Sequence, residues 1–299
     1  MVMRLAGAVL ALAAMLGAVA SAQAGLLDHK RPAAAAAPKI SDADIARIQR
    51  ALDEGRLLDA AKLLDAAVLA AGDDPRVTLL IGDLALARGQ YADALASFKE
   101  VEAHDDTRAR SLQGQGIALS LMGRRDDAIA MLKRAVAEDP SAWRAWDALA
   151  AGYDDRRDWT QAEAAYDHAL ANSDSAAIVL NNRGFSRLLQ ARAGDAIADL
   201  VQALQKKPDL AAARTNLRLA MAMKGEYDRA LAGEAGHDQA SLLNNVGFGA
   251  MMRGDYPKAE EFFNQAITAK GEYYDRASAN LIMARTLEAK PVAAPDAPH

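Results

Sequence analysis

From Ser41 to about Ala289, small and large apolar positions recur along the chain at helical spacing, and the arrangement returns every 34 residues. Gly82 and Gly116 are separated by this period, and so are Gly89 and Gly123. Apolar residues three and four positions apart predict amphipathic helices. A fixed period of this length predicts stacked helical hairpins, because one hairpin cannot bury its apolar face alone. The pattern therefore predicts an all-α chain.

The frame of the period predicts seven helix-turn-helix repeats over residues 41–290. They begin near residues 41, 75, 109, 143, 177, 211 and 240, the sixth is five residues short, and a capping helix follows over residues 274–289. Position 20 of every repeat is alanine, and position 8 is glycine in four repeats. These small residues allow the two helices of a repeat to approach closely, while larger residues at position 24 fill the remaining space.

Glycine also marks the turn inside most repeats, at position 15, where a positive φ costs this residue little. The second helix of the sixth repeat departs from the pattern, because Gly233 and Gly236 interrupt it and Glu234 and His237 fall at core positions. We expect this helix to end early. A plain deletion without consequence is the alternative.

These positions resemble the tetratricopeptide repeat, whose pattern is W-x-x-L-G-x-x-Y followed by A, F, A and P. The repeat from residue 143 supplies Trp146, Leu149, Tyr153, Ala162, Tyr166 and Ala169, and the repeat from residue 109 supplies Gly116, Ala128, Ala135 and Pro140. The resemblance covers about 250 residues and implies a right-handed superhelix, an α-solenoid. It also implies that the first helix of each repeat lines a concave groove.

The groove implied for the last three repeats combines amides with apolar and methionine side chains. Its candidate residues are Asn181, Asn182, Phe185, Asn216, Asn244, Asn245, Phe248 and Met252. Asparagine both donates to and accepts from a peptide backbone, while phenylalanine and methionine adapt to side chains. We predict that this part of the groove binds an extended segment or a helix of a partner protein. The other half of the groove carries charged residues, including Arg76, Arg110, Asp83, Asp147 and Asp154.

Structural roles are the alternative for several of these residues. The resemblance implies that Asn182, Asn216 and Asn245, at position 6, serve hydrogen bonding between repeats. Phe185 and Phe248 can fill the gap between adjacent first helices. Asn181 and Asn244, at position 5, have poor helix propensity, and repeat packing does not require them, which favours a role in binding.

The first 24 residues predict a signal peptide. Arg4 precedes an apolar run from Leu5 to Ala20, and Ala22-Gln23-Ala24 is typical of a cleavage site. The run is short of the roughly 20 residues that span a bilayer, although an uncleaved anchor remains the alternative. We expect cleavage after Ala24, export to the periplasm and no stable membrane insertion of the mature chain.

Three further features bound the domain organisation. Residues 25–40 are rich in alanine and proline and predict a linker, and residues 291–299 predict a disordered tail. The sequence contains no cysteine, which excludes a lipoprotein anchored through that residue and any disulfide.

Composition and motifs argue against several function classes. The net charge is -5 and there is no long basic block, so we expect no nucleic-acid partner. The five histidines have no metal-ligand spacing, and no nucleophile elbow or phosphate-binding loop occurs. Paired aspartates fall at turns and helix starts, where they cap amide groups. We therefore predict a protein that is not an enzyme and uses neither metal nor cofactor. The sequence does not determine its oligomeric state.

A closer resemblance involves the leader, the alanine- and proline-rich linker and the stretch LLNNVGFGAMMRGDYPKAEEFFNQAI. Together they are similar to the TadD family of tetratricopeptide proteins in tight-adherence (Flp) pilus assembly. The resemblance implies an envelope scaffold that helps a pilus secretin reach or assemble in the outer membrane, here as a periplasmic adaptor. A general periplasmic scaffold for envelope or polysaccharide machinery is one alternative. An enzyme, or the non-catalytic subunit of an enzyme, is the other.

Overall fold

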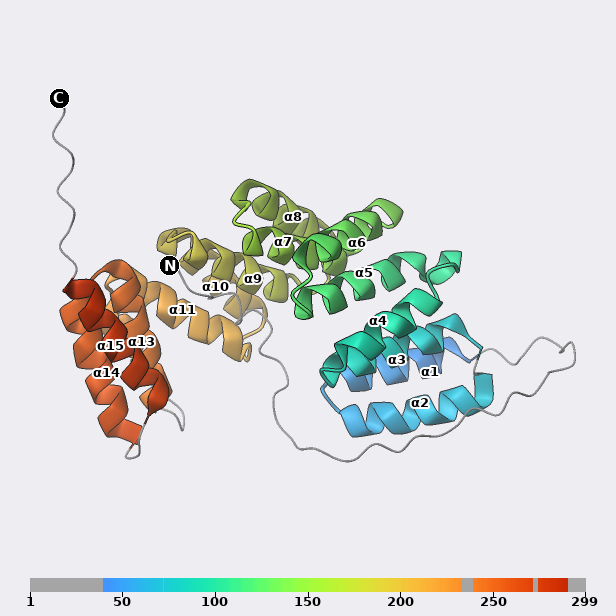
Figure 1. Ribbon diagram of the computed structural model, residues 1–299, viewed down its shortest axis with the longest axis horizontal. Coiled ribbons are helices and arrows are strands. Elements are labelled where there is room, and N and C mark those ends of the chain that lie inside the picture. The colour runs from blue at the N-terminus through green and yellow to red at the C-terminus, as the bar shows by residue number, and fades with distance from the viewer. Residues whose placement is uncertain (1–39, 72, 233–238, 271–273, 290–299) are drawn as a thin grey trace, which may run out of the picture. The chain divides into compact units, whose positions relative to one another are not determined.

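The computed structural model describes residues 40–71, 73–232, 239–270 and 274–289, and within these ranges every regular element is an α-helix (Figure 1). The all-α fold class is thus confirmed for the described residues. The chain divides into two compact units, an N-terminal unit, Met1–Asn172, and a C-terminal unit, Ser173–His299. Each is described separately below.

The helices of both units follow one another as hairpins joined by short turns. The N-terminal unit contains α1 (Asp42–Asp53), α2 (Leu57–Ala71), α3 (Pro75–Ala87), α4 (Tyr91–Glu100), α5 (Asp105–Leu121), α6 (Arg125–Glu138), α7 (Trp143–Asp155) and α8 (Trp159–Asn172). The C-terminal unit contains α9 (Ala176–Leu189), α10 (Ala193–Lys206), α11 (Ala211–Lys224), α12 (Tyr227–Leu231), α13 (Gln239–Arg253), α14 (Tyr256–Lys270) and α15 (Asp275–Glu288).

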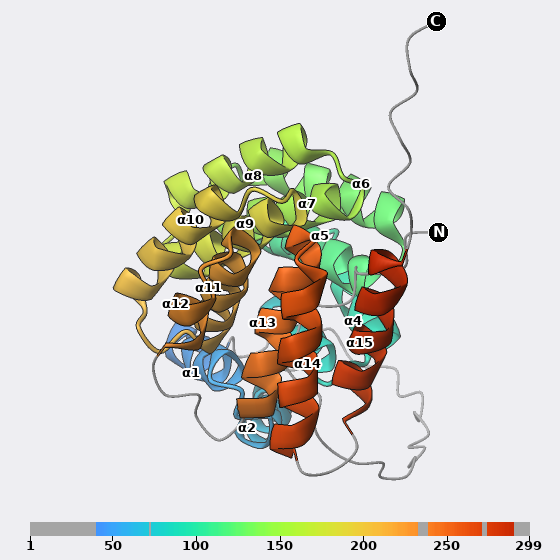
Figure 2. The ribbon, with the colours of Figure 1, turned by 90° about the vertical axis from the view of Figure 1, so that its left-hand side faces the viewer.

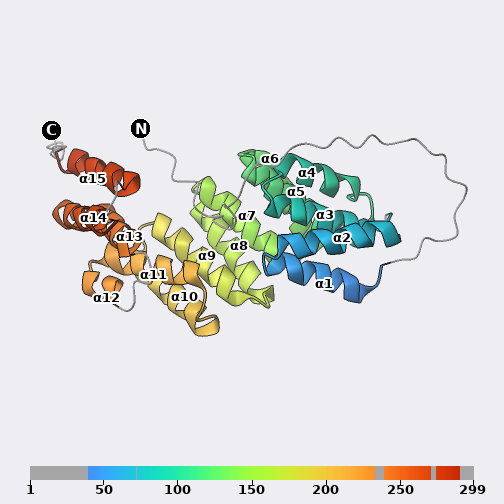
Figure 3. The same cartoon turned by 90° about the horizontal axis from the view of Figure 1, so that it is seen from below.

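Helices that are neighbours in a unit pack side by side. Within the N-terminal unit α1 packs against both α2 and α3, and the view from below shows α1 beside α2 (Figure 3). Within the C-terminal unit α13, α14 and α15 lie next to one another (Figure 2). Odd-numbered helices in each unit also contact the next odd-numbered helix, so the first helices of successive repeats share one side.

In four hairpins a glycine on the first helix faces a large side chain on the second helix. A Cβ atom on Gly82 would lie 2.6 Å from the ring of Phe98, and one on Gly116 would lie 2.5 Å from Leu132. Because real Cβ contacts are not this short, only glycine fits at position 8 of these repeats. The alanines at position 20 are fully buried beside them, as the spacing predicts: Ala60, Ala94, Ala128, Ala162, Ala196, Ala230 and Ala259.

The turns inside the repeats share a left-handed residue at position 15. Five of these residues are the predicted glycines, with φ between 69° at Gly55 and 88° at Gly254. Arg157 and Ala191 hold the same position with φ of 58° although they carry side chains. Sequence reasoning missed these two, because the hairpin imposes the conformation even where glycine is absent.

The sixth repeat is irregular, and its second helix ends early, as its glycines and polar core positions predict. That helix, α12, has only five residues, and Gly233 to His237 lie outside the described residues. The first helix of the seventh repeat, α13, packs directly on α11, the first helix of the sixth repeat. A Cβ on Gly249 would lie 2.5 Å from the Cβ of Ala222 and 3.1 Å from the Leu219 carbonyl oxygen, so this contact requires glycine.

The starts of the first helices can be compared with the 34-residue frame. Those at Asp42, Pro75, Trp143 and Ala211 begin within one residue of a frame start, whereas α5 begins at Asp105, four residues before residue 109. Two aspartates occupy the first turn of α5. Because the helix dipole favours negative charge at this end, they stabilise the additional residues at the N-terminus of the helix.

Several predicted segments lie outside the described residues: the signal peptide over 1–24, most of the linker over 25–40 and the tail over 291–299. They therefore stay predictions. Of the helices that are described, none combines the length and the apolar character that a bilayer crossing demands.

Candidate interaction surface

Two asparagine bridges connect first helices in the C-terminal unit. The side-chain Nδ2 of Asn216 on α11 donates to Oδ1 of Asn181 on α9 at 3.0 Å. The Nδ2 of Asn280 on α15 donates to Oδ1 of Asn244 on α13 at 2.9 Å. Asn181 and Asn244 are buried, with exposed fractions of 9% and 2%. The bridges therefore fix the register of adjacent first helices.

Each buried amide also contacts the asparagine that follows it. Asn181 Nδ2 donates to Asn182 Oδ1 at 3.1 Å, and Asn244 Nδ2 donates to Asn245 Oδ1 at 3.4 Å. Both polar groups of Asn181 and of Asn244 are thus used within the fold. The interpretation that repeat packing does not require these two residues is wrong, since a buried amide costs free energy unless it is paired.

Asn280 is a member of the second bridge that sequence reasoning missed. A signal for it exists in the spacing, because Asn280 follows Asn244 by 36 residues, as Asn216 follows Asn181 by 35. Asn216, Asn245 and Asn280 are half-buried. Within the described part of the chain, Asn216 Oδ1, Asn245 Nδ2 and Asn280 Oδ1 accept or donate no hydrogen bond.

Apolar side chains lie along the same side of these helices, one or two turns after the asparagines. Phe185 and Phe248 are half-buried, whereas Met252 on α13 is 48% exposed and Met283 on α15 is 44% exposed. Residues three or four apart on a helix share a face, so each asparagine and the apolar residue three positions after it are neighbours. We call the set on α9, α11, α13 and α15 the amide face: Ile178, Asn182, Phe185, Leu189, Asn216, Leu219, Met223, Asn245, Phe248, Met252, Asn280 and Met283.

Position 12 of the repeats does not belong to this face. Leu188, Ala222 and Met251 occupy this position on α9, α11 and α13, and all three are buried in the structure. Their side chains pack between helices, because position 12 points toward the neighbouring helix. The exposed surface is therefore limited to positions 2, 6, 9 and 13 of the repeats, and the asparagines at position 5 are buried beneath it.

No residue of the amide face is charged. The arginines of α9 are directed elsewhere: Arg183 and Arg187 both donate to Asp199 of α10, with closest N–O distances of 2.8 Å. Asp199 is 1% exposed. This ion cluster stabilises the α9–α10 hairpin and leaves the face to amides and hydrocarbon.

The corresponding side of the N-terminal unit uses ion pairs where the C-terminal unit uses asparagines. Arg76 on α3 pairs with Asp42 on α1, 34 residues earlier, and Arg110 on α5 pairs with Asp83 on α3. Burial raises the pKa of the Asp83 carboxyl although the Arg110 guanidinium opposes that shift. The two units thus present chemically different surfaces.

A buried phenol and carboxylate lie at the other end of the N-terminal unit. Tyr166 on α8 donates its hydroxyl to Asp154 Oδ2 on α7 at 2.9 Å. Burial, together with the charge of Asp154, raises the pKa of the Tyr166 hydroxyl well above its ordinary value. This pair ties the two helices of one hairpin, and Tyr166 is one of the largest fully buried side chains.

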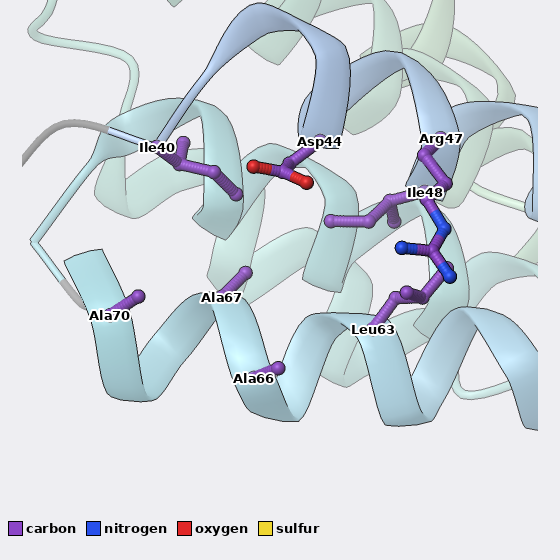
Figure 4. A pocket seen from close by; sticks show the side chains of 8 residues that line it. All are labelled: Ile40, Asp44, Arg47, Ile48, Leu63, Ala66, Ala67 and Ala70. Atoms are coloured by element: carbon purple, nitrogen blue, oxygen red, sulfur yellow. The ribbon is translucent and has the colours of Figure 1, made fainter.

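A pocket of about 240 Å³ lies between α1 and α2 in the N-terminal unit (Figure 4). Isoleucine, leucine and alanine side chains form most of its wall, and Asp44 and Arg47 are its charged residues. Pockets that bind small molecules measure roughly 300–1,000 Å³ and hold several converging polar groups. This pocket is smaller and mainly apolar, so it does not meet the requirements of a catalytic or cofactor site.

The positions of the histidine and acidic side chains bear on metal binding. Across the described residues, no three His, Cys, Asp or Glu side chains come together in a way that could hold a metal ion. His168 is exposed and stacks on Trp146, with ring centroids 4.3 Å apart. Its ring therefore covers an aromatic neighbour on the hairpin surface.

Comparison with known proteins gives matches of two kinds. Residues 45–109 and 114–177 match a family model described as tetratricopeptide repeat. No curated protein matches the sequence. Among solved structures, the crystal structure of the APC/C hetero-tetramer Cut9-Hcn1 gives a TM-score of 0.65 at 16% identity over 83% of this chain and 50% of the other. This chain thus spans about half the length of that relative.

Two further structures are similar over most of their own length. A tetratricopeptide repeat protein from Parabacteroides merdae has a TM-score of 0.51 at 15% identity, over 82% of this chain and 98% of the other. PilW, a widely conserved type IV pilus biogenesis factor, has a TM-score of 0.55 at 18% identity, over 69% and 98%. At these identities the likeness concerns the fold.

Proposed function

We propose that this chain of tetratricopeptide repeats is a non-catalytic interaction scaffold of the cell envelope that binds a segment of a partner protein on its amide face. We propose further that this partner is a component of a tight-adherence pilus assembly system, such as its secretin. The observation that carries the proposal is the amide face itself, an uncharged surface of partly exposed apolar side chains and asparagines. Asn216, Asn245 and Asn280 each keep one polar group without a hydrogen bond to the described residues.

The exposed hydrocarbon supports binding of protein rather than of a small polar molecule. Met252 on α13 is 48% exposed, and Leu189 and Ile178, both on α9, are 40% and 38% exposed. Apolar area removed from water contributes roughly 25 cal/mol per Å², and contiguous exposed apolar patches mark interaction sites. Tetratricopeptide arrays use such surfaces of stacked hairpins for binding.

The envelope location rests on the sequence. Arg4, the apolar run that follows it and Ala22-Gln23-Ala24 predict export, and the absence of cysteine favours a periplasmic adaptor over a lipoprotein. The pilus link rests on the resemblance of LLNNVGFGAMMRGDYPKAEEFFNQAI to the TadD family. The fold also occurs in PilW, a type IV pilus biogenesis factor, which makes such a role compatible with the architecture.

The proposal is tested by co-purification after crosslinking from envelope extracts, with recovered proteins identified by mass spectrometry. The wild-type chain is compared with a Phe248→Ser/Met252→Ser variant and with Val201→Ser, a control on α10 at a residue 36% exposed outside the amide face. We expect a secretin or another pilus component to be recovered with the wild type and the control, and to be lost with the double variant. Recovery of a glycan synthase complex instead would favour the general envelope scaffold.

A further inference from the structure

The hydrogen-bonding groups left on the amide face follow an order across the helices. Asn216 on α11 presents an acceptor, Oδ1; Asn245 on α13 presents a donor, Nδ2; and Asn280 on α15 presents an acceptor, Oδ1. The other polar group of each side-chain amide is hydrogen-bonded to Asn181 or Asn244, so rotating the amide by half a turn would lose that bond. The face therefore presents a hydrogen-bond acceptor on α11, a donor on α13 and an acceptor on α15.

This order of groups matches the backbone of an extended chain. Extended polypeptide presents N–H and C=O groups along its edge, with both available to a partner. A helix uses its own N–H and C=O groups internally and presents side chains instead. A partner that satisfies the amides of Asn216, Asn245 and Asn280 through its backbone must therefore be extended.

The absence of charge on the face limits the side chains of such a partner. A charged side chain pressed against Phe185, Phe248 and Met252 would lose its hydration and gain no counter-charge, which disfavours binding. Apolar side chains gain from the same contact. The ion pairs Arg76–Asp42 and Arg110–Asp83 place charged groups on the corresponding first helices of the N-terminal unit.

The span of the face sets the length of the segment. Packed helices lie roughly 8–10 Å apart, so four first helices from α9 to α15 cover about 25–30 Å. An extended chain rises about 3.3 Å per residue, which corresponds to about eight or nine residues.

We infer that the amide face binds an uncharged, extended segment of about eight or nine residues through its backbone and its apolar side chains. This inference rests on the proposed function, because it specifies the partner for the same surface. It distinguishes the surface from one that takes an amphipathic helix and from one that takes a charged tail.

The inference is tested with a displayed library of random peptides of about ten residues, selected on the immobilised full chain. Clones that bind the Phe248→Ser/Met252→Ser variant as well as they bind the wild type are removed, and folding of the variant is checked by circular dichroism. We expect the remaining peptides to be depleted in Asp, Glu, Lys and Arg relative to the library. Enrichment of charged peptides, or of apolar residues at helical spacing, would overturn the inference while leaving the proposed function in place.

Synthetic versions of the selected peptides separate backbone binding from other modes. N-methylation of a central backbone amide is expected to weaken the dissociation constant by about tenfold or more, whereas the same change at the peptide terminus is expected to have little effect. Affinity is expected to vary by less than about threefold between roughly 0.05 and 0.5 M salt, because no ion pair contributes. Equal affinity after central N-methylation, or a strong salt dependence, would overturn the inference. Recovery of no peptide that depends on Phe248 and Met252 would contradict the proposed function as well.

Discussion

The side chain of Asn216 donates to the side chain of Asn181, 35 residues earlier in the chain, and so joins the first helices α9 and α11. The same relationship recurs between Asn280 and Asn244 across α13 and α15. Among the described residues no asparagine bridge joins α11 and α13, where Gly249 and Ala222 bring the two helices into direct contact. Two bridges and one close contact thus hold the four helices of the amide face.

The bridges give a prediction for stability. Asn181→Ala or Asn244→Ala removes a buried amide that both donates and accepts, and each is expected to lower the free energy of unfolding by about 1–2 kcal/mol. Urea denaturation measures the change. Asn264→Ala, at an exposed position on α14, is the matched control and is expected to change stability by less than about 0.5 kcal/mol. Equal midpoints for the Asn244→Ala and Asn264→Ala variants would show that the bridges contribute nothing.

The contact between α11 and α13 gives a second prediction. Gly249→Ala places a methyl group 2.5 Å from Ala222 and close to backbone atoms, so we expect a loss of about 1–3 kcal/mol from overpacking. Gly194→Ala in α10 is the control, because a Cβ there meets no atom within 4 Å. That substitution is expected to be neutral or to stabilise by up to about 1 kcal/mol. The prediction fails if the two variants unfold at the same temperature.

Tyr166 provides a prediction on pH. Its pKa is raised in the folded chain above the value of about 10 that a tyrosine has when unfolded. The unfolded state therefore loses this proton first, and the stability contributed by the neutral phenol is present below pH ~10 and declines as pH rises above it. We expect the free energy of unfolding of the wild type to fall more steeply above pH ~10 than that of Tyr166→Phe. Parallel stability curves for the two proteins would contradict this assignment.

Asp199 gives the largest expected loss of stability. Asp199→Ala would leave Arg183 and Arg187, whose side chains are 15% and 13% exposed, without the carboxylate that both contact. Breaking a buried ion cluster from one side costs about 3–5 kcal/mol. The exposed pair Arg192–Asp195 in the same hairpin supplies the control Asp195→Ala, expected to cost less than about 1 kcal/mol. A comparable loss in both variants, measured by thermal unfolding, would argue against the cluster as a stabilising element.

The fold was predictable because its determinants are local and periodic. Glycine at position 8 and alanine at position 20 are required by the approach of two helices within one repeat, and Gly116 facing Leu132 shows the cause directly. The early end of α12 was equally predictable from Gly233 and Gly236. The left-handed turns at Arg157 and Ala191 were not, because neither residue favours that conformation on its own.

The candidate surface was predictable only in outline. The pattern placed asparagine, phenylalanine and methionine on one side of the first helices, but it favoured binding for Asn181 and Asn244, which the fold instead buries and hydrogen-bonds. Their structural role depends on hydrogen bonds between asparagines that are 35 and 36 residues apart in the sequence and lie on different helices. The partner Asn280 lies in the capping helix α15, which carries no recognisable copy of the Asn-Asn pair and so gave no signal by itself.

Site-specific photo-crosslinking at the amide face tests the central claim most directly. A benzophenone side chain introduced at Met252 lies on the face, and one at Val201 on α10 lies off it; both positions are exposed in the folded chain. Illumination of cells that produce the full chain is expected to give a discrete partner adduct from position 252 and none from position 201. Adducts of equal yield from the two positions, or an adduct from position 201 alone, would contradict binding at the amide face.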